Sequence, residues 1–299
     1  MTEIHHQATI DTSPGARTRV GAYFALTKPR IIELLLITTV PAMVLAAKSW
    51  PGTWLVIATL IGGTLSAGGA NALNMYYDRD IDEIMRRTRT RPLARHEVEP
   101  RNAMIFGVAL GALGFVWLWV FTTLLAAAIS TAALLFYVFV YTRTLKRSTV
   151  QNIVIGGAAG AAPTLVGWAA VSGSVGVPAW VLFFVVFYWT PPHFWALALR
   201  YKEDYAAAGV PMLPVVAGVH ATTRRMLLYT GLMVGVSLLL VPLGRMSWIY
   251  MVAALVLGAW FLWDTWRVVR RPEEAMRLFT TSTVYLSALF ASVMLDVLL

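Results

Sequence analysis

The sequence predicts an all-α integral membrane protein, a single bundle of nine transmembrane helices. Of its 299 residues, 58% are hydrophobic, only 13% are charged, and the mean hydropathy is +0.67. Soluble domains are about 25% charged, so a soluble globule of this composition would expose large apolar patches. The apolar residues also form continuous runs of about 20 residues, the length that crosses a bilayer as a helix.

Each run is continuous and lacks the period-two alternation of a barrel strand, which favours helices. The second is rich in glycine, the third and fourth divide at Thr122-Thr123, and the sixth contains two consecutive prolines in its interior. The predicted helices are 31–49, 53–77, 102–121, 123–142, 151–171, 178–200, 226–243, 247–266 and 279–298. The polar residues 1–27 are expected to form a disordered cytoplasmic tail, ahead of a transmembrane domain at 28–299.

The charged residues predict how the bundle is oriented. With nine spans, 22 of the 24 Lys and Arg fall on one side, and only Lys48 and Arg245 fall on the other. The positive-inside rule places the N-terminus and the basic side in the cytoplasm, or on the matrix side of a mitochondrion. This distribution explains the net charge of +9 without a nucleic-acid partner. The chain has no cysteine, which excludes disulfides, thiolate metal sites and cysteine nucleophiles.

A polar motif at the end of the second run carries the first functional signal. Asn74, Asp78 and Asp82 are spaced four residues apart, so on a helix their oxygens line one narrow face. Two carboxylates and an amide oxygen are hard ligands that suit Mg²⁺. Because Mg²⁺ is usually held by one or two carboxylates together with substrate phosphates, the spacing predicts a Mg²⁺–phosphate site at the cytoplasmic end of the helix.

Basic residues follow this motif. Arg87 and Arg91 lie in the loop behind it, and Lys146 and Arg147 end the fourth run. Guanidinium groups match phosphate oxygens, so these residues are candidate ligands of a substrate diphosphate. The alternative interpretations are a solvated, salt-bridged loop and, for Lys146 and Arg147, a purely topological role.

A second polar cluster lies in the other half of the chain. The sixth run contains Pro191-Pro192-His193, and Lys202, Glu203 and Asp204 follow it. This pattern resembles a degenerate internal repeat of the first cluster. His193 is the only histidine in a predicted span, and haem iron is commonly held by His, which makes it a candidate haem-site residue. The alternative is a histidine with a purely structural role in a kinked helix.

Together these features predict an enzyme that binds an amphiphilic diphosphate. The charged head would lie at a cytoplasmic cavity mouth, with an apolar bundle behind it for a polyprenyl tail. Mg²⁺ and basic side chains would offset the charge on a departing diphosphate. The dry interior would keep the resulting allylic carbocation from water.

At this point the motifs resemble a known family. Asn74-x3-Asp78-x3-Asp82, followed by Arg91-Pro92-Leu93, is similar to the UbiA-type intramembrane prenyltransferases over about residues 24–299. The stretches at 152–157, 189–197 and 204–214 resemble one branch, the protohaem IX farnesyltransferases, or haem O synthases. The resemblance implies nine helices and transfer of a farnesyl group from farnesyl diphosphate to a vinyl group of haem b, giving haem O for terminal oxidases.

The candidate residues fall into two groups. The candidate catalytic residues are Asn74, Asp78, Asp82, Arg87, Arg91 and Lys146, and the first three are the candidate Mg²⁺ ligands. The candidate substrate-binding residues are Tyr141, Arg147, Asn152, His193, Lys202, Glu203 and Asp204.

One departure from the family pattern affects the choice of substrate. Quinone-type members usually carry a second Asp-x3-Asp motif, and here the matching positions are Tyr201 and Tyr205. This favours haem over the alternative acceptor, a quinone precursor or other aromatic. A membrane transporter and a non-catalytic haem-binding subunit are further alternatives.

The N-terminal segment lacks an Arg-rich transit peptide, which favours a bacterial plasma membrane over a mitochondrial inner membrane. The expected partners are the lipid bilayer and a downstream haem A synthase or terminal oxidase assembly.

Overall fold

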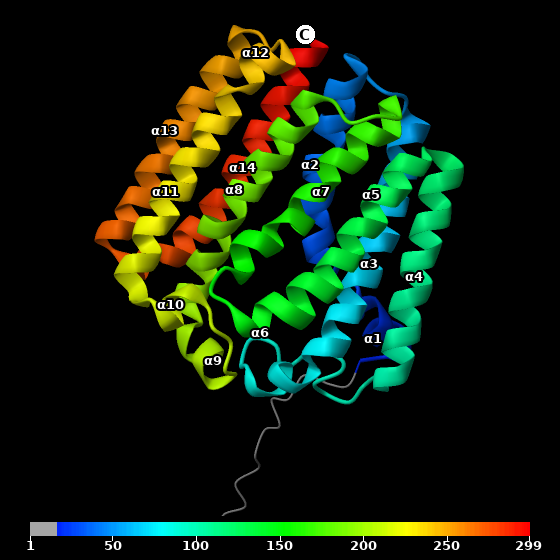
Figure 1. Cartoon of the computed structure of the whole chain (residues 1–299), viewed down its shortest axis with the longest axis vertical. Coiled ribbons are helices and arrows are strands. Elements are labelled where there is room, and N and C mark those ends of the chain that lie inside the picture. Colours follow the sequence, from blue (N-terminus) through cyan, green and yellow to red (C-terminus); the bar gives the residue numbers. More distant parts are fainter. Residues whose placement is uncertain (1–16) are drawn as a thin grey trace, which may run out of the picture.

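The computed structural model describes residues 17–299, which are helical and contain no strand (Figure 1). Eight helical segments in this part are long and apolar enough to cross a membrane. A ninth long helix, α2 (Pro29–Ala47), holds a shorter apolar segment, Ile37–Ala47. The prediction of an all-α membrane protein is confirmed, whereas the count of nine crossing helices stays a prediction.

The predicted apolar runs correspond to the long helices of the structure. After α1 (Arg19–Leu26) and α2, the remaining elements are α3 (Thr53–Ile84), α4 (Pro100–Phe121), α5 (Leu124–Leu135), η1 (Phe136–Leu145), α6 (Lys146–Ser148), α7 (Asn152–Ser172), α8 (Val177–Arg200), α9 (Lys202–Ala207), α10 (Leu213–Val216), α11 (Gly218–Leu238), α12 (Leu240–Gly244), α13 (Trp248–Arg270), η2 (Pro272–Glu274) and α14 (Ala275–Leu298).

Two helices are longer than their apolar runs. α3 continues beyond the run to Ile84, and α11 begins at Gly218, eight residues before its predicted start. In both cases the added turns carry polar side chains, so a prediction based on hydropathy leaves them out of the helix. The extension of α3 matters for function, because it keeps Asp78 and Asp82 on a helix.

Helix α1 corrects part of the expected disordered tail. Residues 19–26 are helical, and the Thr18 hydroxyl caps their start by accepting a hydrogen bond from Gly21 N at 3.2 Å. Ala22 and Leu26 are buried in a cluster with Ala72 of α3. This small apolar face gives the segment a packing surface that its overall polarity concealed. Residues 1–16, the rest of the expected tail, lie outside the described residues.

The basic segments lie together at one end of the bundle. Figure 1 shows α1, α6, α9 and α10 at the lower end, whereas α12 and the C-terminus lie at the upper end. Lys48 is at this opposite end, where its Nζ donates to Gly244 O at 2.7 Å. The predicted sorting of charge between two ends is therefore present, and the orientation of those ends in a bilayer stays a prediction.

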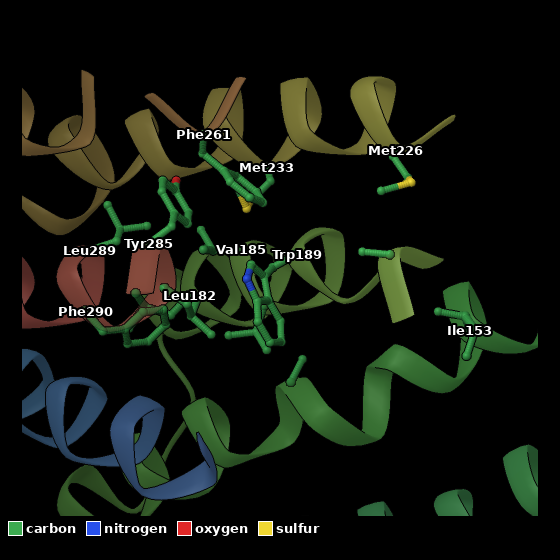
Figure 2. Close-up of a cluster of buried hydrophobic side chains, with 14 of the residues drawn as sticks. Ile153, Leu182, Val185, Trp189, Met226, Met233, Phe261, Tyr285, Leu289 and Phe290 are labelled. Atoms are coloured by element: carbon green, nitrogen blue, oxygen red, sulfur yellow. The ribbon is translucent and has the colours of Figure 1, made fainter. Parts of the chain in front are cut away.

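The two halves of the bundle are packed differently. α3 and α4 approach closely through glycines, since a Cβ on Gly69 would lie only 2.7 Å from Gly107 O. The second half instead has a large-side-chain core between α8, α11, α13 and α14, which includes Trp189, Phe261 and Phe290 (Figure 2). The cavity of the candidate site lies between these two regions, and Trp189 of the large-side-chain core forms part of its wall.

Candidate active site

The polar motif of α3 forms one buried face, as its spacing predicts. Asn74, Asp78 and Asp82 are 3%, 0% and 1% exposed. Asn74 Nδ2 donates to Asp78 Oδ2 at 2.8 Å, so residues one turn apart are in direct contact. Buried carboxylates are costly unless they are paired, and the surrounding chain supplies the partners.

Each member of the motif faces a basic side chain from another segment. Lys146 Nζ, on α6, lies 2.5 Å from Asp78 Oδ2. Arg91 Nη1, in the loop after α3, lies 2.8 and 2.7 Å from the two oxygens of Asp82. The structure therefore brings together the candidate catalytic residues of three separate segments.

Lys28 is a member of this cluster that sequence reasoning missed. Its Nζ donates to Asn74 Oδ1 at 2.7 Å. Lys28 lies between α1 and α2 with φ of 52°, a backbone conformation that residues other than glycine seldom adopt. In the sequence, Lys28 could be assigned only to membrane topology, and no spacing links it to Asn74, which is 46 positions away.

One carboxylate oxygen of the cluster has no hydrogen-bond partner. Asp78 Oδ1 is buried and unpaired, and the Arg147 Nη2 atom lies 3.9 Å from it. The described residues contain no group of three His, Cys, Asp or Glu side chains that could hold a metal. The donor set here is instead two carboxylates and an amide, which suits Mg²⁺, because this ion keeps several water or phosphate ligands.

A cavity of about 290 Å³ opens from this cluster into the bundle. Its polar end is lined by Asn74, Asp78, Arg87, Arg91 and Lys146, and its apolar part includes Leu60, Leu134, Val166, Val186 and Trp189. The cavity thus joins a charged head region to an apolar tail region, as the sequence predicts.

The tyrosines between these regions are held by an unpredicted π-helix. In η1, the Thr142 hydroxyl donates to Tyr137 O at 2.8 Å, five residues back. Tyr137 and Tyr141 line the cavity and stack with ring centroids 5.4 Å apart. Gly156 of α7 leaves room for the Tyr141 ring, with which any Cβ there would collide. π-helical turns are rare and often occur at functional sites.

Arg147 lies on the outer side of the cluster rather than in the cavity. Its guanidinium donates to both oxygens of Asp80 at 2.7 Å and to Tyr77 O at 2.9 Å. It lines a separate surface pocket together with Arg79 and Arg143. The expected role of Arg147 in binding substrate is therefore supported only by its 3.9 Å approach to Asp78.

The acids after α8 do not form a second site in the cavity, contrary to the predicted repeat. Asp204 is buried and receives hydrogen bonds from Arg86 Nε at 2.8 Å and from Arg87 N at 3.3 Å. These bonds hold the pKa of Asp204 below its usual range. Neither Lys202 nor Glu203 lines the cavity. All of the donors to Asp204 come from the loop after α3, so this acid ties the loop to α9.

Asn152 and His193 also lie outside the cavity lining. Asn152 Nδ2 donates to Thr149 O at 2.6 Å, at the start of α7. The His193 ring is 6% exposed and is stacked between Trp189 and Phe279, with Nδ1 2.7 Å from Ser282 Oγ on α14. This position fits the structural alternative for His193, because packed aromatic rings on both faces leave no room for a haem. The side chain of Glu33 in α2, an isolated acid of the first predicted span, lies outside the described residues.

Comparison with known proteins gives a consistent result. The sequence model of the UbiA prenyltransferase family matches residues 35–290. A protein from Parafrankia sp. (strain EAN1pec), named protoheme IX farnesyltransferase, is 53% identical over 282 residues, which cover 93% of this chain and 90% of that protein. Other relatives of the same name are 51% to 55% identical.

Solved structures share the fold at low sequence identity. A structure described as digeranylgeranylglyceryl phosphate synthase is 17% identical with a TM-score of 0.77, covering 93% of this chain and 98% of that one. A UbiA homologue from Archaeoglobus fulgidus, solved with DMAPP and Mg²⁺, is 15% identical with a TM-score of 0.62, covering 91% and 99%. At these identities the likeness establishes the fold.

Proposed function

The chain belongs to the UbiA prenyltransferase family, and we propose that it transfers a farnesyl group from farnesyl diphosphate to a vinyl group of haem b, giving haem O. The observation that carries this proposal is the buried cluster of Asn74, Asp78 and Asp82, of which Asn74 and Asp78 line the polar end of an apolar cavity. The choice of haem b as acceptor is supported by the relatives named protoheme IX farnesyltransferase. They are 51% to 53% identical to this chain over 93% to 98% of its length.

The polar end of the cavity is suited to holding a diphosphate. Asn74, Asp78 and Asp82 would hold Mg²⁺, and Asp78 Oδ1 is a buried oxygen free to bind it. When bound, Mg²⁺ would act as a Lewis acid that offsets negative charge on the departing diphosphate. Lys146, Arg87 and Arg91 line the same end and would donate hydrogen bonds to the phosphate oxygens.

The apolar part of the cavity is suited to stabilising the allylic cation and to keeping it from water. As the bond from C1 of the farnesyl group to the diphosphate oxygen breaks, positive charge develops on the allyl system. Tyr137, Tyr141 and Trp189 line the cavity, and aromatic faces attract such a charge. The apolar walls exclude water until the vinyl carbon forms the new bond to C1.

The alternative functions lack a supporting observation. Quinone-type members usually carry a second Asp-x3-Asp motif, and here Tyr201 and Tyr205 occupy the matching positions. A transporter would place its polar site near the midplane of the membrane. Here the paired acids lie in the last turns of α3, at one end of the bundle.

The chain is a multi-pass membrane protein, and we place it in a bacterial plasma membrane rather than a mitochondrial inner membrane. The sorting of basic residues to one end supports a cavity mouth that faces the cytoplasm. Haem O made there would pass to a haem A synthase or to terminal oxidase assembly.

Mass spectrometry of the product tests the proposal. The purified protein, in detergent with Mg²⁺, is supplied with haem b and farnesyl diphosphate, and we expect the mass of haem O to appear. Parallel reactions replace haem b with an aromatic quinone precursor. Prenylation of the quinone precursor with no change to haem b would overturn the choice of acceptor.

A further inference from the structure

Two glycines in the cavity wall border open space. A Cβ built on Gly63 of α3 or on Gly160 of α7 meets no heavy atom within 4 Å, and both residues line the cavity. Gly157, another glycine of α7, has different surroundings, because a Cβ there would lie only 3.1 Å from the Thr190 side chain. Gly157 therefore serves close packing, whereas Gly63 and Gly160 leave volume inside the cavity itself.

The rise of α3 gives the depth of Gly63. Gly63 lies eleven positions before Asn74, the innermost residue of the polar motif. At a helix rise of about 1.5 Å per residue, Gly63 lies about 16 Å deeper than Asn74. Ordinary carbon–carbon bonds give an extended isoprene unit a length of about 5 Å. Gly63 therefore lies about three isoprene units from the head of the site.

Gly160 lies at a shallower level. Asn74 Nδ2 donates to Thr142 Oγ1 at 3.0 Å, which places Tyr141 and Thr142 level with the head of the site. The Tyr141 ring packs against Gly156, and Gly160 is four residues further along α7. One helical turn raises it by about 6 Å, or about one isoprene unit.

We propose that Gly63 determines the length of the isoprenoid chain that the cavity accepts, and that Gly160 leaves room for the first unit of any donor. The diphosphate would bind at the polar end of the cavity, which Asn74, Asp78 and Lys146 line. The chain then passes Gly160 at its first unit and reaches Gly63 at its third. This inference rests on the proposed prenyl transfer and adds to it the residue that selects a three-unit donor.

Substitution by leucine at the two depths tests the proposal. The full-length variants Gly63→Leu and Gly160→Leu are compared with wild type using geranyl and farnesyl diphosphate as donors and haem b as acceptor. For Gly63→Leu we expect the ratio of farnesyl to geranyl kcat/KM to fall at least about tenfold, because a branched side chain would occupy the space of the third unit. For Gly160→Leu we expect both donors to lose activity.

A matched control separates cavity filling from effects on the helix. Gly235 of α11 is exposed and also has open space around its Cβ position, but it does not line the cavity. Gly235→Leu should leave the donor ratio unchanged. If Gly63→Leu does not fold, Gly63→Ala should shift the ratio in the same direction by a smaller factor.

Binding is measured independently of transfer. Thermal stabilisation of each variant by geranyl or farnesyl diphosphate with Mg²⁺ should show the same loss of preference in Gly63→Leu. An unchanged farnesyl preference in that variant, in binding and in transfer, would overturn the length proposal. A wild-type protein that binds farnesyl diphosphate but leaves haem b unmodified would instead overturn the proposed function, and the binding preference would still decide the role of Gly63.

Discussion

The polar ends of α3 and of α8–α9 have similar residues but different surroundings. Both carry acidic side chains with basic neighbours close by in the fold, and the sequence predicts that they form related halves of one site. In the structure Asp78 lines the cavity and keeps one oxygen without a partner. Asp204 receives hydrogen bonds on both of its oxygens and lies outside the cavity lining.

This difference shows what separates a functional acid from a structural one. A buried carboxylate that lies outside the cavity and is bonded on both oxygens by one neighbouring loop contributes mainly to the position of that loop. A buried carboxylate that lines a cavity and keeps one oxygen without a hydrogen bond carries a cost that a bound ligand can offset. The α3 cluster meets this second condition, so its loss should affect chemistry, whereas loss of the α9 cluster should affect the position of a loop.

The largest effect is expected at Asp78. Asp78→Asn keeps the size of the side chain and removes its charge, so turnover of farnesyl diphosphate and haem b should fall by a factor on the order of a hundred to a thousand. The control is Asp264→Asn, because Asp264 is also a buried helical acid but bonds to Thr281, away from the cavity. Equal activity of the two variants in a haem O assay would contradict the assignment.

Two lysines extend the same comparison. Lys146→Met removes the cation beside Asp78 and should lower kcat/KM for farnesyl diphosphate about tenfold to a hundredfold, the worth of a charge-assisted hydrogen bond. Lys202→Met, in the second cluster, should lower it by far less, since Lys202 does not line the cavity. Steady-state kinetics with haem b held at saturation measures both. A larger loss in Lys202→Met would restore the idea of a two-part site.

Much of the fold and half of the site follow from local sequence patterns. Apolar runs predict the helices because a bilayer requires long apolar segments. The spacing of Asn74, Asp78 and Asp82 predicts a shared face because helix geometry is regular. Both are short-range rules, and both hold in the structure.

The rest of the site depends on contacts that no spacing encodes. Lys28 reaches Asn74 only after α1 and α2 pack against α3. The direction of Asp204 is decided by a loop more than one hundred positions away. The π-helix that holds Tyr137 and Tyr141 looks in the sequence like any apolar helix. Only the structure shows that the Lys146 N–H and the Thr142 and Thr144 hydroxyls bond five residues back.

His193 provides a test of stability rather than catalysis. His193→Ala leaves the Ser282 hydroxyl without this partner and removes a ring from between Trp189 and Phe279. We expect a loss of about 1–3 kcal/mol in unfolding free energy, measured by thermal unfolding in detergent, with KM for haem b unchanged. The exposed His220→Ala is the control. A raised KM for haem b at unchanged stability would revive the predicted haem-site role.

The smallest effect is expected at the contact between Arg86 and Asp204. Asp204→Asn removes the charge that holds the loop bearing Arg87 and Arg91, so KM for farnesyl diphosphate should rise by no more than about fivefold, as for a partly exposed ion pair. Glu203→Gln should have less effect, because Glu203 is exposed and its contact with Arg86 is longer, at 3.6 Å.

Lowering the pH should release the loop at residues 85–99 from Asp204 in the wild-type protein. The pKa of Asp204 is lowered in the fold, chiefly by Arg86, so the contact contributes fully above the ordinary pKa of an aspartate, about 3.9. It is lost as the pH falls through the lowered value. Limited proteolysis of residues 85–99 with an acid-active protease should therefore accelerate below about pH 4 in wild type. In Asp204→Asn the loop should be cleaved at similar rates on both sides of that pH, because no charge remains to titrate. A wild-type loop that stays protected through this pH range would show that Asp204 does not hold it, and the second cluster would then need another role.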